Sequence, residues 1–207
     1  MYCAGDPVNR IDPDGRKTFF LQKDGNIIEN TSIWDKIKSF LGIGTDKLIG
    51  ANNKLLASFP DGTINLSSNN GDVTKVEIKE DKYANKFSDA VMKDNDIEWA
   101  RIKHGKEGKT SNTIQNNHND RDVSSAVATL EKYSNNGETI LLLDHSHPIP
   151  NDVQGTNMGG FAKLAVSPED MSTVAKYKPN VNRVFNKKTG RIEYYNSKRV
   201  YHYEKWK

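Results

Sequence analysis

The chain of 207 residues contains a single cysteine, Cys3. One cysteine cannot form an internal disulfide, and it cannot supply the paired thiolates of a cysteine-based zinc site. A zinc deaminase, which needs such a pair, is disfavoured for the same reason. A metal ion in this protein would therefore have to be held by histidine and carboxylate side chains.

Long hydrophobic runs and an excess of one charge are also missing. No apolar stretch approaches the roughly 18–20 residues that a membrane helix needs, and the first residues lack the basic-then-apolar order of a secretory signal. We therefore expect no membrane insertion. The 30 basic residues are offset by 27 acidic ones, for a net charge of +3. This balance favours a mixed-charge surface and gives no reason to expect nucleic-acid binding.

Helical and strand-like patterns alternate through the second half of the chain. This alternation predicts a layered α/β (α+β) fold in which a mixed sheet is flanked by helices. The predicted helices cover residues 81–93, 121–133 and 167–176, and the predicted strands cover residues 97–102, 139–147, 181–185 and 191–195. The last two strands flank a turn ending in Gly190 and are expected to form a hairpin.

The first half of the chain predicts a β-rich accessory region. Asp24-Gly25 and Asp61-Gly62 each lie between short apolar runs, which is typical of hairpins. Between them, residues 33–41 have the spacing of an amphipathic helix. Further on, residues 105–120 are polar and predict an exposed loop, with His104 and His118 solvated in or beside it.

The most informative run is Thr139–Pro148, an apolar stretch that ends in Asp144-His145-Ser146-His147-Pro148. Alternate side chains of a strand share a face, so His145 and His147 can offer two imidazole nitrogens to one metal ion. Histidines near a strand end also hydrogen-bond ordinary backbone groups, so a ligand pair and a pair of ordinary histidines both remain possible interpretations.

A carboxylate that could complete the site follows in Ser167-Pro168-Glu169-Asp170. Asp170 would add an anionic oxygen to the two nitrogens and leave a fourth position open, as in catalytic zinc sites. The same four residues are typical of a helix start, because Ser suits the N-cap and Pro the first helical position.

These residues resemble the signature of the JAB/MPN/JAMM metalloprotease family, which has an upstream Glu, then His-Ser/Thr-His-Pro, then Ser-x-x-Asp. Glu98, His145-Ser146-His147-Pro148 and Ser167–Asp170 occur here in that order. The resemblance implies that His145, His147 and Asp170 hold Zn²⁺. It also implies that Glu98 accepts a proton from water and that Ser167 donates a hydrogen bond to the oxyanion.

The resemblance also implies an activity, the hydrolysis of a peptide or isopeptide bond in a protein substrate. Two alternatives to Glu98 in the sequence are Glu80 and Glu107, although neither opens an alternating strand after a helix as well as Glu98 does. The interval between His147 and Ser167 exceeds the seven or so residues usual in the family. Asp170 can therefore act as a ligand only if residues 149–166 loop out.

The first residues, Tyr2 to Gly15, resemble the closing motif of the Rhs-repeat-associated core, Tyr-x-x-x-Asn-Pro-x-x-x-x-Asp-Pro-Asp-Gly, with Asp6 in place of the usual Asn. In that family a variable toxin follows the motif, so the resemblance implies the JAB-like toxin group. Together, the two resemblances divide the chain into the end of the Rhs core (1–15), the accessory region (16–80) and a JAB/MPN-like hydrolase domain (81–207).

The same resemblance implies the partners and the destination of the protein. We expect an Rhs delivery shell in the full-length protein and a cognate immunity protein. Delivery would occur through a contact-dependent or type VI secretion system, and the toxin would act in the cytoplasm of the target cell.

Two other functions remain open. Asp144-His145-x-x-Pro148 also resembles the opening of an HNH nuclease, which needs an Asn and a further His soon afterwards; Asn157 is present, but the next histidine is His202. A metal-free MPN-like module that acts by binding a partner is the non-enzymatic alternative.

Overall fold

The computed structural model describes residues 17–30, 44–69, 71–119, 124–148 and 166–207. Four strands form a small sheet in the order β2-β1-β3-β4. They are β1 (Thr18–Leu21), β2 (Ile27–Asn30), β3 (Thr45–Ile49) and β4 (Leu55–Pro60). β3 runs parallel to β1, and the other pairs are antiparallel.

Eight strands form a large sheet in the order β12-β11-β10-β9-β7-β8-β6-β5. They are β5 (Asn65–Asn69), β6 (Thr74–Ile78), β7 (Ala100–Lys106), β8 (Lys109–Asn116), β9 (Thr139–His147), β10 (Val181–Asn186), β11 (Arg191–Tyr195) and β12 (Val200–Lys205). Only β9 and β10 pair in parallel within this sheet. β9 therefore lies inside the sheet, between β7 and β10.

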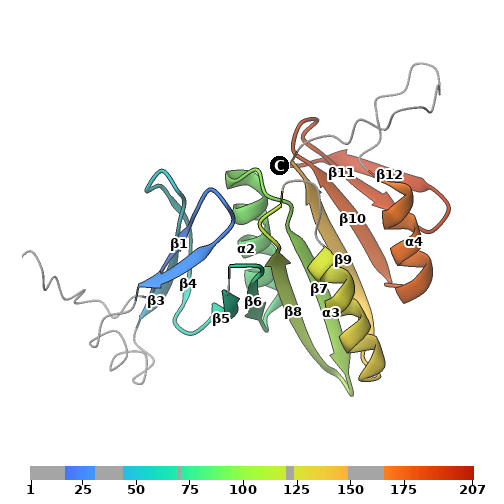
Figure 1. The fold of residues 1–207 in the computed structure, drawn as a ribbon, viewed down its shortest axis with the longest axis horizontal. Coiled ribbons are helices and arrows are strands. Elements are labelled where there is room, and N and C mark those ends of the chain that lie inside the picture. Colours follow the sequence, from blue (N-terminus) through green and yellow to red (C-terminus); the bar gives the residue numbers. More distant parts are fainter. Residues whose placement is uncertain (1–16, 31–43, 70, 120–123, 149–165) are drawn as a thin grey trace, which may run out of the picture.

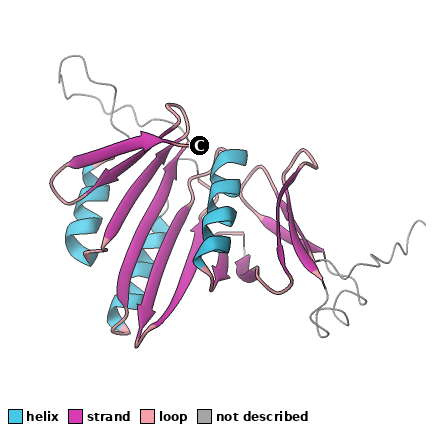
Figure 2. Ribbon diagram, turned by 180° about the vertical axis from the view of Figure 1, so that it is seen from behind, coloured by secondary structure: helices cyan, strands magenta, loops and turns pink. Residues whose placement is uncertain are grey.

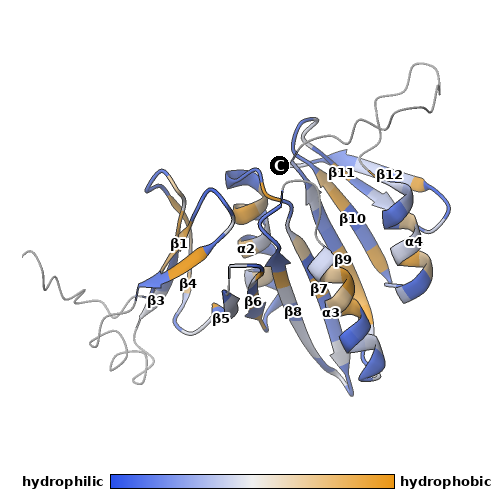
Figure 3. Cartoon of the chain, viewed as in Figure 1, coloured by the Kyte–Doolittle hydropathy of each residue, from blue (hydrophilic) through white to orange (hydrophobic). Residues whose placement is uncertain are grey.

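Three helices in the described part cover the large sheet: α2 (Asp81–Asp94), α3 (Ser124–Asn135) and α4 (Pro168–Tyr177). α3 and α4 lie on one face (Figure 1), and the view from behind shows α2 on the other (Figure 2). Because both faces are covered, β9 carries a continuous apolar run rather than an alternating one. Figure 3 shows this hydrophobic stretch on β9, with another on β10.

Two hydrophobic clusters hold these layers together. On the α2 side, Phe87 and Trp99 are fully buried in a cluster that also includes Phe19 of the small sheet. On the α3 and α4 side, Leu130 and Val184 are buried between the helices and the sheet. Burial of each such large side chain stabilises the fold by roughly 1.5–3 kcal/mol. The small sheet therefore shares a core with the large one.

The predicted fold class is confirmed, because a mixed sheet is flanked by helices and preceded by a β-rich region. The three helices of the second half form within a few residues of their predicted bounds. β1 and β2 form the first hairpin, in which Gly25 takes a φ of 85° that favours glycine. β10 and β11 form the C-terminal hairpin.

The second predicted hairpin, around Asp61-Gly62, is wrong. β4 pairs with β3 and β5 pairs with β6, so the turn connects the two sheets instead of closing a pair of strands. The Asp-Gly signal located a turn, but it did not identify the partners of the flanking strands. The large sheet thus begins at Asn65 and takes two strands from the segment assigned to the accessory region; the division at residue 80 stays a proposal.

The predicted exposed loop over residues 105–120 is also wrong. This segment contains the last two residues of β7 and all of β8, and the last five residues of β8 are buried. β8 is paired on both sides and contacts α2 and α3, so the polar side chains of its second half are enclosed. The buried ones, Asn112, Thr113, Gln115 and Asn116, each have a hydrogen-bond partner, as buried polar groups require. Examples are Thr113 with Tyr133 at 2.7 Å, Gln115 with Thr129 at 2.9 Å and Asn116 with the Gly25 carbonyl at 3.0 Å.

The two histidines assigned to that loop are not solvated. His104 is buried in β7, where its ring stacks on Tyr133 at 3.6 Å and its Nδ1 lies 2.5 Å from Glu138 Oε2. His118 is partly buried, and its Nδ1 donates to the Asp24 carbonyl at 2.8 Å. Both histidines therefore stabilise the packing between elements.

Several predicted features lie outside the described residues. They are the motif in residues 1–15, the helix over residues 33–41 and nearly all of the insertion at residues 149–166. Among the helices that are described, none has the length and apolar character needed to cross a membrane.

A buried carboxyl group in β3 predicts a pH-dependent stability. Asp46 accepts a hydrogen bond from the Ile64 amide at 2.8 Å, while its other oxygen has no partner in the described part of the chain. Burial raises the pKa of Asp46 from 3.8 to about 6. The folded state therefore keeps a proton that the unfolded state loses, so the free energy of unfolding falls as pH rises from 4 to 6, by up to about 3 kcal/mol.

Urea unfolding of the wild type and of Asp46→Asn at pH 4 and pH 7 measures this effect. Asn stays neutral at both values, so the variant should lose less stability across the window. Equal pH dependence of the two proteins would show that Asp46 does not titrate in this range.

Candidate metal centre

β9 brings the two histidines to one face of the large sheet. His145 and His147 are both buried, and their ring centroids lie 4.8 Å apart. Ser146 points to the opposite face, where its Oγ accepts a hydrogen bond from the Trp99 amide at 3.0 Å. The alternation of a strand thus places both imidazoles together, as the sequence predicts.

Glu98 reaches the histidines because of the register between β7 and β9. Ala100 pairs with His145 in antiparallel strands, so Glu98, two residues earlier, lies across from His147. Its backbone amide donates to the Asn119 carbonyl at 2.9 Å. Glu98 Oε1 lies 3.5 Å from His147 Nε2, and the residue is 5% exposed. Glu98 lies two residues before the start of β7 and not within a strand, in contrast to the predicted strand over residues 97–102.

Asp170 reaches the same histidines from the first turn of α4. Its Oδ1 lies 3.0 Å from His145 Nε2 and its Oδ2 lies 3.9 Å from His147 Nε2. Oδ2 also accepts from the Ser167 amide at 2.7 Å, while Ser167 Oγ accepts from the Asp170 amide at 3.1 Å. This pair of hydrogen bonds is a capping box. One carboxylate therefore caps the helix and contacts the histidine pair.

The donor atoms of this cluster have the spacing of ligands around one zinc ion. Ligand atoms of Glu98, His145 and His147 all lie within 4.8 Å of one another. In a tetrahedral site with bonds of about 2.0–2.1 Å, two ligand atoms lie roughly 3.4 Å apart. The separations between Asp170 and the two histidines and between Glu98 and His147 lie near this value.

A second observation tests whether a metal ion fits. His145 Nε2 is buried and makes no hydrogen bond in the described part of the chain, although Asp170 Oδ1 lies close to it. A buried imidazole nitrogen is normally satisfied. Two nitrogens and carboxylate oxygens are a donor set that suits Zn²⁺. The residues present therefore fit a metal ion, and their donor atoms are of the kinds that zinc accepts.

The charges in the cluster are mutually dependent. Burial by itself lowers the pKa of His145, but the attraction of Asp170, helped by Glu98 and Asp144, outweighs it and raises the pKa to about 9. Burial raises the pKa of the Asp170 carboxyl, yet His145 and His147 hold it below its usual range. A cation at this position is thus favoured whether it is a proton on His145 or a metal ion.

A small cavity of about 60 Å³ opens beside the cluster under α3 and α4. His145, Asp170, Thr173 and Tyr195 provide its polar groups, and the remaining walls are apolar. Sequence patterns did not identify Tyr195 as part of a site. The strand register places it there. Tyr195 in β11 lies opposite Asn182 in β10, and Val184, two residues further along β10, pairs with His145 in β9.

The fold and the site together define a mixed α/β domain with a buried histidine and carboxylate centre. Residues 76–175, just under half of the chain, match the family model described as JAB-like toxin 1. The matched segment includes Glu98, His145, His147 and Asp170, and the match supports a JAB-like toxin domain over these residues. Among curated proteins and solved structures, none matches the chain.

Proposed function

We propose that this protein is a secreted toxin effector that hydrolyses peptide or isopeptide bonds with the help of a zinc ion. The JAB-like toxin match supports a toxin domain, and the buried cluster of Glu98, His145 and His147 fits a metal ion. The observation that carries the proposal is the position of Asp170, 3.0 Å from His145 despite the long interval between His147 and Ser167.

In the proposed site, His145, His147 and Asp170 would hold the zinc ion. When bound, zinc would lower the pKa of water from about 15.7 toward about 7 and supply a nucleophile near neutral pH. Glu98 accepts the proton that this water loses and transfers it to the leaving amine. Its burial and its contact with His147 keep the carboxylate next to the reacting atoms.

Ser167 is proposed to stabilise the oxyanion of the tetrahedral intermediate. Its Oγ accepts a hydrogen bond from the Asp170 amide, which positions the hydroxyl at the start of α4. The hydroxyl hydrogen can then be donated to the carbonyl oxygen of the substrate. Loss of one such donor typically raises the barrier by about 3 kcal/mol.

The metal content of purified protein tests the ligand assignment. We expect one zinc ion per chain in the wild type and a large loss of zinc in His147→Ala, because the imidazole supplies one of three bonds. His202→Ala is the matched control, since His202 is exposed on β12 and should not affect zinc. Elemental analysis with parallel circular dichroism separates metal loss from unfolding.

Two results would contradict the proposal. Wild-type levels of zinc in a folded His147→Ala variant would remove His147 from the ligand set. Equal loss of zinc in the His147→Ala and His202→Ala variants would place the metal elsewhere or show nonspecific binding.

The delivery of the toxin is a further part of the proposal. The Rhs-like motif in the first fifteen residues supports an Rhs shell upstream of the toxin, a contact-dependent or type VI secretion route and a cognate immunity protein. A toxin that cleaves proteins would find its substrates in the cytoplasm of the target cell.

The nuclease alternative is not favoured by the arrangement of histidines. His202 pairs with Tyr194, which pairs with Arg183, which in turn pairs with Asp144. This row faces away from His145, because neighbouring residues of β9 point to opposite faces. His202 therefore cannot join His145 in one HNH-type site.

A further inference from the structure

Tyr195 lies beside the proposed zinc site. It is in β11 and is 0% exposed. Its ring meets the His145 ring edge to face, with centroids 6.2 Å apart. Its strand neighbour Tyr194 points to the opposite face, in the row of Asp144. Tyr195 is therefore on the same face of the sheet as the two histidines, and it lines one cavity with Asp170 and Thr173 of α4.

The hydroxyl of Tyr195 makes no hydrogen bond within the described part of the chain. Buried hydroxyl groups normally have a partner, because an unsatisfied one disfavours the folded state. Tyr133 shows the usual arrangement, since its hydroxyl is 2.7 Å from Thr113 Oγ1. A phenylalanine at position 195 would fill the same space without this cost. The hydroxyl therefore requires an explanation other than packing.

The cavity that Tyr195 lines offers such an explanation. It measures about 60 Å³ and is shared with His145 and Asp170. This volume can hold a water molecule or a carbonyl group, but not a whole side chain of a substrate. The usual pKa of a tyrosine hydroxyl, about 10, lies well above neutral pH. The phenol thus stays protonated and can donate a hydrogen bond.

We propose that Tyr195 is a catalytic residue whose hydroxyl donates a hydrogen bond to the scissile carbonyl oxygen as it acquires negative charge. This inference rests on the proposed function and adds a second donor to Ser167. The donor comes from the sheet, whereas Ser167 comes from the start of α4. Preorganised donors in a site closed to water stabilise a developing oxyanion more strongly than water does.

Binding of acetohydroxamate tests the donor without measuring activity. This small zinc-binding compound presents an anionic oxygen like that of the intermediate. Calorimetric titration of zinc-loaded protein should show binding that is about tenfold or more weaker in Tyr195→Phe, because a hydrogen bond to a charged group is lost. Zinc content should be unchanged in this variant.

Thermal unfolding of the metal-free proteins supplies the second measurement, and Tyr133→Phe is the matched control. Tyr195→Phe should unfold at the same temperature as the wild type or higher, because no hydrogen bond is removed. Tyr133→Phe should unfold about 2–4 °C lower, since it loses the bond to Thr113. Its affinity for acetohydroxamate should equal that of the wild type.

The outcomes separate this inference from the proposed function. Unchanged affinity in zinc-loaded Tyr195→Phe, or a lower unfolding temperature of the metal-free variant, would overturn the inference and leave the zinc site intact. A wild-type protein that binds no zinc would overturn the proposed function and this inference with it. Weaker affinity at unchanged stability supports the role of Tyr195.

Discussion

Glu98→Gln is expected to abolish toxicity and to reduce amide hydrolysis by a factor of roughly 10²–10⁴, the usual contribution of a general base. Gln has nearly the same shape as Glu but cannot accept the proton. The backbone hydrogen bond from the Glu98 amide to Asn119 does not depend on the side chain, so the fold should persist. Growth of expressing cells and hydrolysis by purified protein measure the effect.

The zinc content of Glu98→Gln decides between two roles for this carboxylate. Glu98 lies within ligand distance of both histidines, so its position suits a ligand as well as a base. Unchanged zinc with lost activity indicates the base, and lost zinc indicates a ligand. Glu80→Gln and Glu107→Gln are matched controls at exposed positions and should behave as wild type. Full toxicity of Glu98→Gln would exclude Glu98 from the mechanism.

The residues of the candidate site could be predicted because their spacing is short or their order is distinctive. A strand places His145 and His147 on one face whatever lies around it. The contact of Asp170 with them could not be derived, since it depends on the course of the chain between β9 and α4. The capping box also shows that a helix-start pattern and a candidate metal ligand can be the same residues.

The pairing of strands was harder to predict than the strands themselves. Asp24-Gly25 and Asp61-Gly62 look alike in the sequence, yet one closes a hairpin and the other connects two sheets. The polar composition of β8 led to the wrong prediction of a loop. Its Asn and Thr side chains are buried and have hydrogen-bond partners on α3, in the turn between β1 and β2, and on β7. Such partners are distant in sequence, so no local pattern indicates them.

The sequence patterns missed Tyr195, because its contact with the site is made between residues of different strands. Tyr195 contacts His145 only through the register of β9, β10 and β11. A tyrosine at the end of a predicted hairpin strand is equally typical of an ordinary core residue. Its unsatisfied hydroxyl, which distinguishes it from Tyr133, becomes visible only when neighbouring side chains are placed.

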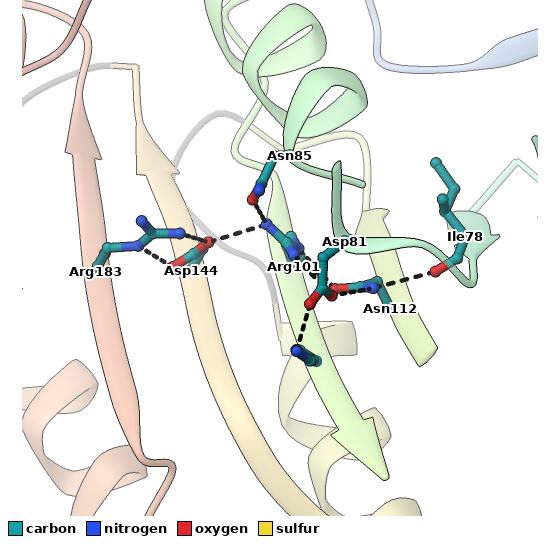
Figure 4. Close-up of polar contacts among 8 residues, drawn as sticks. Ile78, Asp81, Asn85, Arg101, Asn112, Asp144 and Arg183 are labelled. Carbon is teal, nitrogen blue, oxygen red and sulfur yellow. Dashed lines mark hydrogen bonds and ion pairs between the residues drawn. The ribbon is translucent and has the colours of Figure 1, made fainter. Parts of the chain in front are cut away.

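Asp144→Ala is expected to lower the free energy of unfolding by about 3–5 kcal/mol, the usual cost of removing one partner from a buried ion pair. Asp144 is buried and accepts two hydrogen bonds from Arg183, at 2.8 and 2.7 Å. It also lies 3.8 Å from Arg101, which is buried and further held by Asn85 and Asn112 (Figure 4). The variant would leave two guanidinium groups without their shared carboxylate. Urea unfolding measures the loss.

An exposed ion pair with a similar donor–acceptor distance is the control. Asp96 lies 2.8 Å from Lys187 Nζ but its side chain is 80% exposed, so Asp96→Ala should cost less than about 1 kcal/mol. Equal losses in the two variants would show that burial does not determine the strength of the Asp144 network. Because Asp144 points away from the face of His145, folded Asp144→Ala protein should still bind zinc. The network thus stabilises the strand that carries the histidines without supplying a metal ligand.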